Sequence, residues 1–238
     1  MLHMLSFQPD IVRFSKFAAR ERLLPQGEDT GYAWHAILAA TFGVHAPKPF
    51  HWFQARTREG GTQGRLLAYS AKSIEELREH AVTFADPAYL DILQLDDAAS
   101  KVMTISFPIG QLLGFQVRVR PTMRTGADRG GGRGRERDAY DANVDSDRSQ
   151  RYVAWLRERL EQRGARLHDE RVDALRLTAL LTRSRRDEQA IRRSTLGPDV
   201  VIGGTLSVTD PELFSSAITR GIGRHRAFGF GMLLLRPA

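Results

Sequence analysis

Residues 205–237 read TLSVTDPELFSSAITRGIGRHRAFGFGMLLLRP, and the architecture of the C-terminal part can be worked out from them. Their first residues end an apolar run, 200–210, that predicts a strand. Asp210 and Pro211 predict the start of a helix, because proline is favoured at the first helical position. The glycine-rich segment GIGRHRAFGFG (221–231) follows, and the apolar run Met232–Leu235 predicts a closing strand.

The rest of the chain extends this pattern into two similar halves. The second half is expected to hold strands at 112–120, 175–185 and 200–210, with helices at 148–164 and after Asp210. The first half is expected to hold strands at 2–8, 50–57, 65–71 and 101–108, with helices at 11–24, 31–43 and from Ser73. Each half then has the order β-α-β-β-α-β. The sequence therefore predicts an α+β fold of two tandem ferredoxin-like (RNA-recognition-type βαββαβ) domains, 1–110 and 111–238.

The segment 221–231 combines four glycines with two arginines and one histidine. Glycine allows a close backbone approach, and arginine offers a fork of donors that matches phosphate oxygens. An anion held against this loop is one interpretation. The loop is not a nucleotide-binding loop of a familiar kind, because GxxxxGK[ST] is absent and a strand, not a helix, is expected after it. A glycine-rich turn into the closing strand stays open as the alternative.

Charge points to a polyanionic partner. The chain has 238 residues, a net charge of +7 and a pI near 10.2. Only four of its 35 basic residues are lysine, and arginines cluster at 118–137 and 183–193. A GC-rich coding sequence would explain the arginine excess but not the clusters, so nucleic acid is favoured. With no cysteine, no secretory signal and no apolar run of membrane-spanning length, we expect a cytoplasmic protein without disulfides or a membrane partner.

One histidine has a neighbour suited to chemistry. Tyr32 and His35 are three residues apart, on one face of the helix expected at 31–43. An imidazole and a phenol near an arginine-lined groove can cleave RNA without metal, one group taking the 2′-OH proton and another protonating the 5′-oxygen. The alternative is that both merely flank a core stripe of Trp34, Ile37 and Leu38. Neither HxxxH nor HExxH occurs, so we expect no metal and no cofactor.

Three stretches resemble one known family, the CRISPR repeat-processing endoribonuclease CasE of type I-E Cascade. The segment 205–237 resembles the family's strand, short helix, glycine-rich loop and closing strand. The stretch GYAWHAILAATFG (31–43) is similar to the helix that carries a tyrosine and a histidine three apart. The stretch VMTISFPIGQLLGFQVRVRP (102–121) resembles the strands that join the two domains. The longer segment 10–29 and the glycine- and arginine-rich stretch 121–147 depart from the family, and leave open a similar type IV enzyme.

The resemblance implies a role in antiviral defence: a metal-independent endoribonuclease that cuts CRISPR precursor RNA within its repeats, 3′ of the hairpin, by 2′-OH attack. It would keep the mature guide RNA and bind other Cascade-type subunits. His35 and Tyr32 are the implied catalytic pair. The residues expected to contact RNA are Gly221, Gly223, Arg224, His225, Arg226, Gly229, Gly231, Arg118, Arg120, Arg133 and Arg135. A non-catalytic RNA-binding subunit is the main alternative, and an architectural DNA-binding protein is a third.

Overall fold

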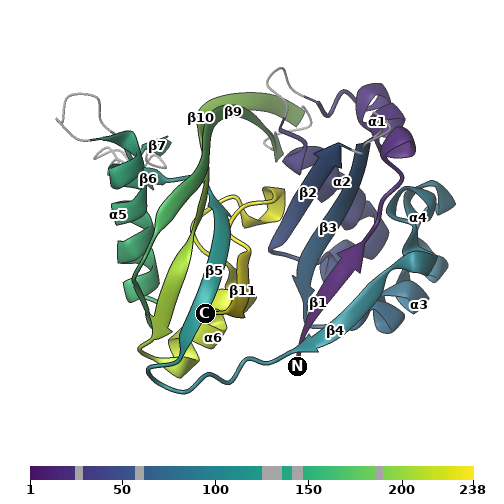
Figure 1. The fold of residues 1–238 in the computed structure, drawn as a ribbon. Coiled ribbons are helices and arrows are strands. Elements are labelled where there is room, and N and C mark those ends of the chain that lie inside the picture. Colours follow the sequence, from purple (N-terminus) through teal and green to yellow (C-terminus); the bar gives the residue numbers. More distant parts are fainter. Residues whose placement is uncertain (25–28, 57–61, 125–135, 141–146, 186–189) are drawn as a thin grey trace.

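The computed structural model describes residues 1–24, 29–56, 62–124, 136–140, 147–185 and 190–238. Its first sheet is antiparallel and has the strand order β2-β3-β1-β4. The strands are β1 (Leu2–Phe7), β2 (Phe50–Arg56), β3 (Thr62–Ser70) and β4 (Ala99–Met103). The helices of this half are α1 (Ile11–Arg20), α2 (Gly31–Phe42), α3 (Ile74–Phe84) and α4 (Pro87–Leu93), and they lie along one side of the sheet (Figure 1).

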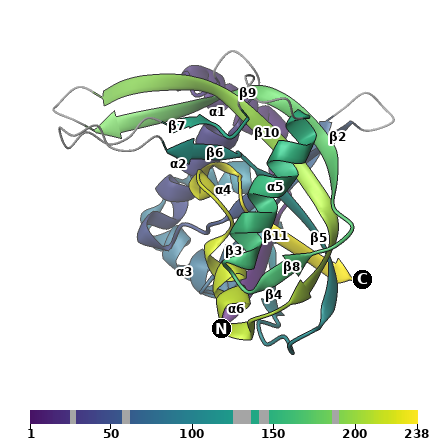
Figure 2. The same cartoon turned by 90° about the vertical axis from the view of Figure 1, so that its left-hand side faces the viewer.

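The second sheet has the order β11-β5-β10, with β8 and β9 both paired to the far edge of β10. Its strands are β5 (Leu112–Val119), β8 (Ala165–Leu167), β9 (Arg171–Arg185), β10 (Ala190–Val208) and β11 (Leu233–Pro237). The helices are α5 (Arg148–Glu161) and α6 (Pro211–Arg220), and a small hairpin joins β6 (Thr122–Arg124) to β7 (Glu136–Asp138). Figure 2 shows α5 lying across this sheet.

Both sheets have the ferredoxin-like arrangement. The four main strands are β1, β2, β3 and β4 in the first half and β5, β9, β10 and β11 in the second. Numbered 1 to 4 along the chain within each half, they lie in the spatial order 4-1-3-2, which is what a βαββαβ chain produces when each helix returns across the sheet. The predicted α+β class and the two tandem ferredoxin-like domains are therefore confirmed.

Side chains point alternately to the two faces of the first sheet, and both faces are apolar. Leu5 and Leu66 belong to the core under the N-terminal helices. Leu2 and Tyr69, which point the other way, belong to the core of the C-terminal half. The Tyr69 hydroxyl also donates to the Leu233 carbonyl of β11 (2.9 Å). Since side chains alternate along a strand, one sheet serves both cores and joins the two halves.

Several local predictions are confirmed by the caps. The Asp10 and Asp210 side chains accept backbone N–H groups at the starts of α1 and α6. Ser73 and Glu76 form the expected capping box of α3, since each side chain accepts the other's backbone N–H. Each cap satisfies donors that the first helical turn leaves free, so these starts could be located from single residues.

Other boundaries differ from the predicted ones. Helix α1 ends at Arg20 instead of reaching Leu24, because Arg22 adopts a left-handed backbone (φ 52°) that stops the helix. Strand β4 covers 99–103, whereas 101–108 was expected. Helix α4 and the short strands β6, β7 and β8 were not predicted. The strands β9 and β10 are longer than expected, and residues 190–199 pair with β9 before the pairing with β5 begins at Val200. Along the described residues no helix is long and apolar enough to cross a membrane.

Candidate functional site

Helix α2 presents Tyr32 and His35 on its half-buried side. Its other side is packed into the N-terminal core through Trp34, Ile37 and Leu38. The Tyr32 and His35 rings lie edge to face, with centroids 6.1 Å apart. The i, i+3 spacing therefore brings a phenol and an imidazole together, and it does so beside the core stripe rather than within it.

The glycine-rich loop touches this pair. The short helical turn η3 (Arg226–Phe228) places Phe228 against both rings, 5.9 Å from Tyr32 and 5.0 Å from His35 between centroids. At the start of α2, a β-carbon on Gly31 would stand 2.1 Å from the Phe228 carbonyl oxygen, so the helix needs glycine there. Two segments almost 200 residues apart in the sequence thus form one site.

His35 has an environment that favours its neutral form. Burial lowers the pKa of the imidazole, and the positive charge of Lys48 lowers it further. A cavity of about 140 Å³ opens beside the ring, and Lys48, Pro47 and Ala227 are among its lining residues. A neutral imidazole can accept a proton at neutral pH, which is the property a general base requires.

The loop is folded tightly on itself. Gly223 has φ +74°, and a β-carbon there would stand 2.8 Å from the Trp155 ring. Gly231 has φ +77°, and a β-carbon there would stand 2.2 Å from the Ile222 carbonyl oxygen. Side chains would be strained at that φ and would collide with their neighbours, so Gly223 lets the loop pack against α5 and Gly231 lets it pack against itself.

A larger cavity of about 670 Å³ is lined by the loop and by the end of α6. Four of its lining residues carry a positive charge: Lys48, Arg220, Arg224 and Arg226. Arg226 is held in place by a hydrogen bond from Nη1 to the Arg220 carbonyl (2.7 Å). Lys48 lines this cavity and also the small one beside His35, so the basic surface runs up to the imidazole.

The positive charge continues past this cavity. Burial lowers the pKa of the Arg163 guanidinium, and the charges of Arg226, Arg159 and Arg220 lower it further. Like charges brought this close destabilise the folded chain, and such a cluster is the usual electrostatic footprint of a polyanion site.

Glu136 of β7 is an acidic partner of the loop. Its carboxylate lies 2.7 Å from His225 Nε2 and 3.2 Å from Arg224 Nε. The hydrogen bond from His225 is the main cause that lowers the pKa of Glu136 to about 2. The carboxylate is therefore ionised at neutral pH and holds these two side chains against the β6–β7 hairpin.

Not every residue predicted to contact RNA lies at this surface. The Arg118 and Arg120 side chains point into the protein, where Arg118 pairs with Asp29 and Asp199. Arg120 is 3% exposed and donates to the carbonyls of Thr178 and Thr195. The loop glycines Gly221, Gly229 and Gly231 are buried, and Gly223 is half-buried. Arg133 and Arg135 lie outside the described residues.

Lys48 and Arg163 were missed in the sequence analysis. Lys48 is one of four lysines in a chain with 31 arginines, which is the only local signal it carries. Arg163 follows α5 in a sequence rich in arginine, so nothing nearby marks it. Both become prominent only when the two halves are packed together. Within the described ranges, no group of three or more His, Cys, Asp or Glu side chains is placed to hold a metal ion.

Comparison with known proteins gives one family and a set of similar structures. The model of a family described as CRISPR associated protein matches residues 10–237. The CRISPR-associated endoribonuclease Cse3 of Thermus thermophilus is 33% identical over 132 residues. That match covers 54% of this chain and 57% of the relative, so the chain spans little more than half of that protein's length.

Solved structures match over the whole chain. A structure of CRISPR endoribonuclease Cse3 bound to a 19-nucleotide RNA has a TM-score of 0.64 at 20% identity, and covers 100% of both chains. The crystal structure of the CRISPR-associated protein Cas6e from Escherichia coli K-12 has a TM-score of 0.57 at 18% identity, again over 100% of both chains. At these identities the likeness establishes a shared fold.

Proposed function

This chain belongs to the CRISPR-associated protein family, and from that membership we propose that it is an endoribonuclease that cuts CRISPR precursor RNA within its repeats. The resemblance carried by residues 31–43 and 205–237 is thereby confirmed at the level of the family. The observation that carries the activity is the contact of Tyr32 and His35 with the glycine-rich loop beside a basic cavity. A pair of side chains suited to proton transfer then lies next to a surface suited to binding phosphate.

The proposed reaction is an internal transesterification. The 2′-OH of the nucleotide before the scissile bond attacks the neighbouring phosphorus, and the bond to the 5′-oxygen of the next nucleotide breaks. Neutral His35 accepts the 2′-OH proton, and the Tyr32 hydroxyl gives its proton to the departing 5′-oxygen, which leaves as the 5′-OH; the proton held by His35 then returns to Tyr32 through solvent. Lys48 lines the same small cavity as His35, and its proposed role is to stabilise negative charge that develops on the phosphorane.

The RNA hairpin is proposed to bind across the cationic surface of Lys48, Arg220, Arg224, Arg226 and Arg163. His225 and Arg224 are held by Glu136, so phosphate oxygens compete with one carboxylate for their donors. We place the domain boundary between 110 and 111, supported by β4 ending at Met103 and β5 starting at Leu112. The proposed setting is the cytoplasm, with the mature guide RNA and other effector subunits as partners.

Incubation of the protein with its own genomic CRISPR repeat RNA tests the activity. We expect cutting at one site 3′ of the hairpin, equal rates with and without EDTA, and products that carry a 2′,3′-cyclic phosphate and a 5′-OH. The reason is that the nucleophile comes from the RNA and the protons move through His35 and Tyr32. End-group analysis of the products and rates in EDTA measure both. Activity lost in EDTA and restored by magnesium contradicts this mechanism, and tight binding without cutting supports the non-catalytic alternative.

The loop arginines have their own expected effect. Arg224→Ala and Arg226→Ala should each weaken repeat binding, and each should lower the log–log salt slope by about 0.7–0.9 for every phosphate that the variant no longer binds. Fluorescence titrations at several salt concentrations measure this. Arg13→Ala is the matched control, because Arg13 pairs with Asp91 on the helical side of the N-terminal half and its replacement also removes one charge. If both loop variants keep the wild-type slope, the loop is only a turn into the closing strand and does not bind phosphate.

A further inference from the structure

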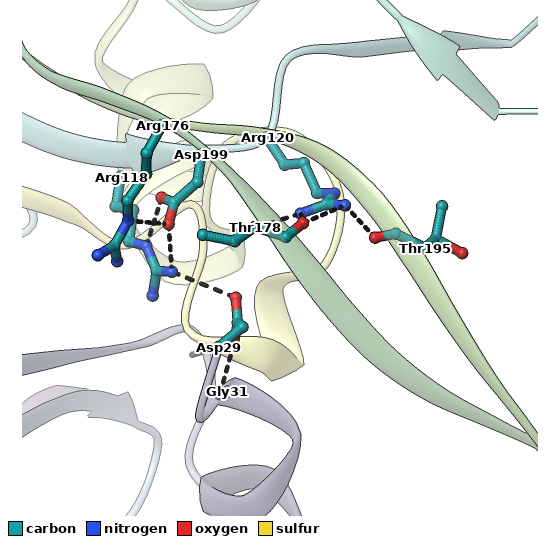
Figure 3. A network of polar contacts seen from close by, with 8 residues as sticks. All are labelled: Asp29, Gly31, Arg118, Arg120, Arg176, Thr178, Thr195 and Asp199. Carbon is teal, nitrogen blue, oxygen red and sulfur yellow. Dashed lines mark hydrogen bonds and ion pairs between the residues drawn. The ribbon is translucent and has the colours of Figure 1, made fainter. Parts of the chain in front are cut away.

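A buried polar network joins the second sheet to the start of α2 (Figure 3). Asp199 of β10 accepts Arg118 Nε (2.7 Å) and Nη2 (2.8 Å), the two-pronged pairing that suits a guanidinium and a carboxylate. The oxygen that accepts Arg118 Nη2, Asp199 Oδ2, also accepts Arg176 Nε (2.8 Å). The Asp199 side chain is 2% exposed and that of Arg118 is 11% exposed, so this pairing takes place away from water.

Arg118 carries the network across to the N-terminal half. Its Nη2 atom lies 3.3 Å from Asp29 Oδ2, and the Asp29 side chain is fully buried. The other carboxylate oxygen of Asp29 accepts the backbone N–H of Gly31, the first residue of α2, at 2.6 Å. One guanidinium therefore connects β10, through Asp29, to the helix that bears Tyr32 and His35.

Arg118 also contacts the glycine-rich loop. Its backbone carbonyl accepts the N–H of Gly231 at 2.6 Å, and its guanidinium lies 4.3 Å from the centre of the Phe230 ring. Arg118 therefore contacts both the loop and, through Asp29, the start of α2. These are the two walls of the candidate site, since Phe228 of the loop touches the rings of Tyr32 and His35.

The charges of the network favour a role in holding its partners in a defined position. Burial raises the pKa of Asp29, whereas the paired arginines keep the pKa of Asp199 low despite its burial. Desolvating such charges is expensive, and well-packed apolar groups often stabilise a fold equally well. Unlike apolar contacts, hydrogen-bonded charges hold their partners at a set distance and direction.

We propose that Asp29, Arg118 and Asp199 are positioning residues that hold the start of α2 against the glycine-rich loop at the separation that RNA cleavage needs. This inference rests on the proposed endoribonuclease function. It gives Arg118 a role inside the protein in place of the RNA contact expected from the sequence. An error of about 1 Å in the placement of reacting groups lowers a rate by about 10²-fold, so a shift of α2 should affect cleavage far more than RNA binding.

Asp29→Asn and Arg118→Lys break the same link from its two ends. For each, we expect the single-turnover rate at saturating protein to fall by about 10–100-fold, whereas the half-saturating concentration stays close to that of the wild type. The double variant should be no slower than the slower single variant, because Asp29→Asn acts through the contact with Arg118, which Arg118→Lys has already removed. Asp173→Asn is the matched control with an unchanged rate: it also neutralises an aspartate on the second sheet, one that pairs with Gln116 and Arg171.

Hydrogen exchange provides a readout that does not depend on cleavage. In both link variants, peptides covering residues 29–36 should exchange about tenfold faster than in the wild type, whereas peptides covering α6 keep their rate. The positioning role would be overturned by an unchanged exchange rate at 29–36 or by faster exchange throughout the chain. It would also be overturned if the cleavage rate and the affinity for RNA fell by equal factors. If the wild type does not cut repeat RNA, the proposed function fails, and exchange at 29–36 alone decides whether the network holds the helix.

Discussion

His35→Ala should lower the single-turnover cleavage rate by about 10²–10⁴-fold, the usual contribution of general acid–base catalysis. Affinity for the repeat RNA should change little, because the surface proposed to bind the RNA is the cationic one lined by Lys48 and the loop arginines. The half-buried imidazole lies at the edge of this surface, where it contacts Tyr32 and Phe228. Rates measured at saturating protein and titrations with uncleaved RNA separate the two effects.

Two further variants distinguish chemistry from packing. Tyr32→Phe keeps the ring that stacks on Phe228 but removes the hydroxyl, so a loss of rate there reports chemistry. His168→Ala is the control, because His168 is exposed and bonds to Ser207 in the C-terminal half. If His35→Ala lowers the melting temperature and RNA binding together while Tyr32→Phe is silent, the pair is only part of the core. If His35→Ala folds, binds and cuts well, the catalytic assignment is wrong.

The direction of the His35 pKa predicts the pH dependence of this step. Burial and Lys48 lower that pKa below its ordinary value of 6.5, so the imidazole is already neutral at pH 7. A general base acts in its neutral form, so the rate at subsaturating protein should rise with pH below 6.5 and then level off. A rate that falls as the pH rises from 6 to 8 would instead make His35 the proton donor.

A single 2′-deoxyribose placed 5′ of the scissile phosphate should abolish cleavage. The missing hydroxyl is the proposed nucleophile, so no variant of the protein and no added metal should restore the cut. Affinity should stay near that of the unmodified RNA, because the phosphates are retained and they supply most of the binding energy. Gel assays of the modified repeat, with binding measured in parallel, test both expectations.

The matched control carries the deoxyribose one nucleotide further 5′. This RNA lacks the same kind of group but keeps the nucleophile, so it should be cut at the normal rate. Cleavage of the first RNA at an unchanged rate would exclude 2′-OH attack. Loss of cleavage in both RNAs would show that the sugar contributes through binding geometry.

Local signals in the sequence predict the fold where one residue decides a boundary. Asp10, Ser73 and Asp210 cap their helices as expected. Asp86 and Pro87 carry the same signal as Asp210 and Pro211, and they start the unpredicted helix α4, so this signal was present and overlooked. The unpredicted length of β10 has another cause. Its residues 190–199 pair with residues 176–185 of β9, and hydrophobic alternation in the sequence does not predict such pairing.

The candidate site could be predicted only in part. The i, i+3 spacing of Tyr32 and His35 is local, and so is the composition of the loop. The contact of Phe228 with both rings, the place of Lys48 beside His35 and the pairing of Arg118 with Asp29 all depend on how the halves pack. An arginine in a strand has the same sequence signature whether it faces RNA or a buried carboxylate.

The shared first sheet has a consequence for how this protein can be divided. Leu2 and Tyr69 belong to the core of the C-terminal half, although both are residues of the first sheet. A cut in the stretch between β4 and β5 would expose that apolar face on one fragment and leave its counterpart, around Leu233 of β11, uncovered on the other. The same cut would separate α2 from the glycine-rich loop. Neither fragment would contain the whole candidate site, so the two domains depend on each other both to cover their apolar surface and to assemble that site.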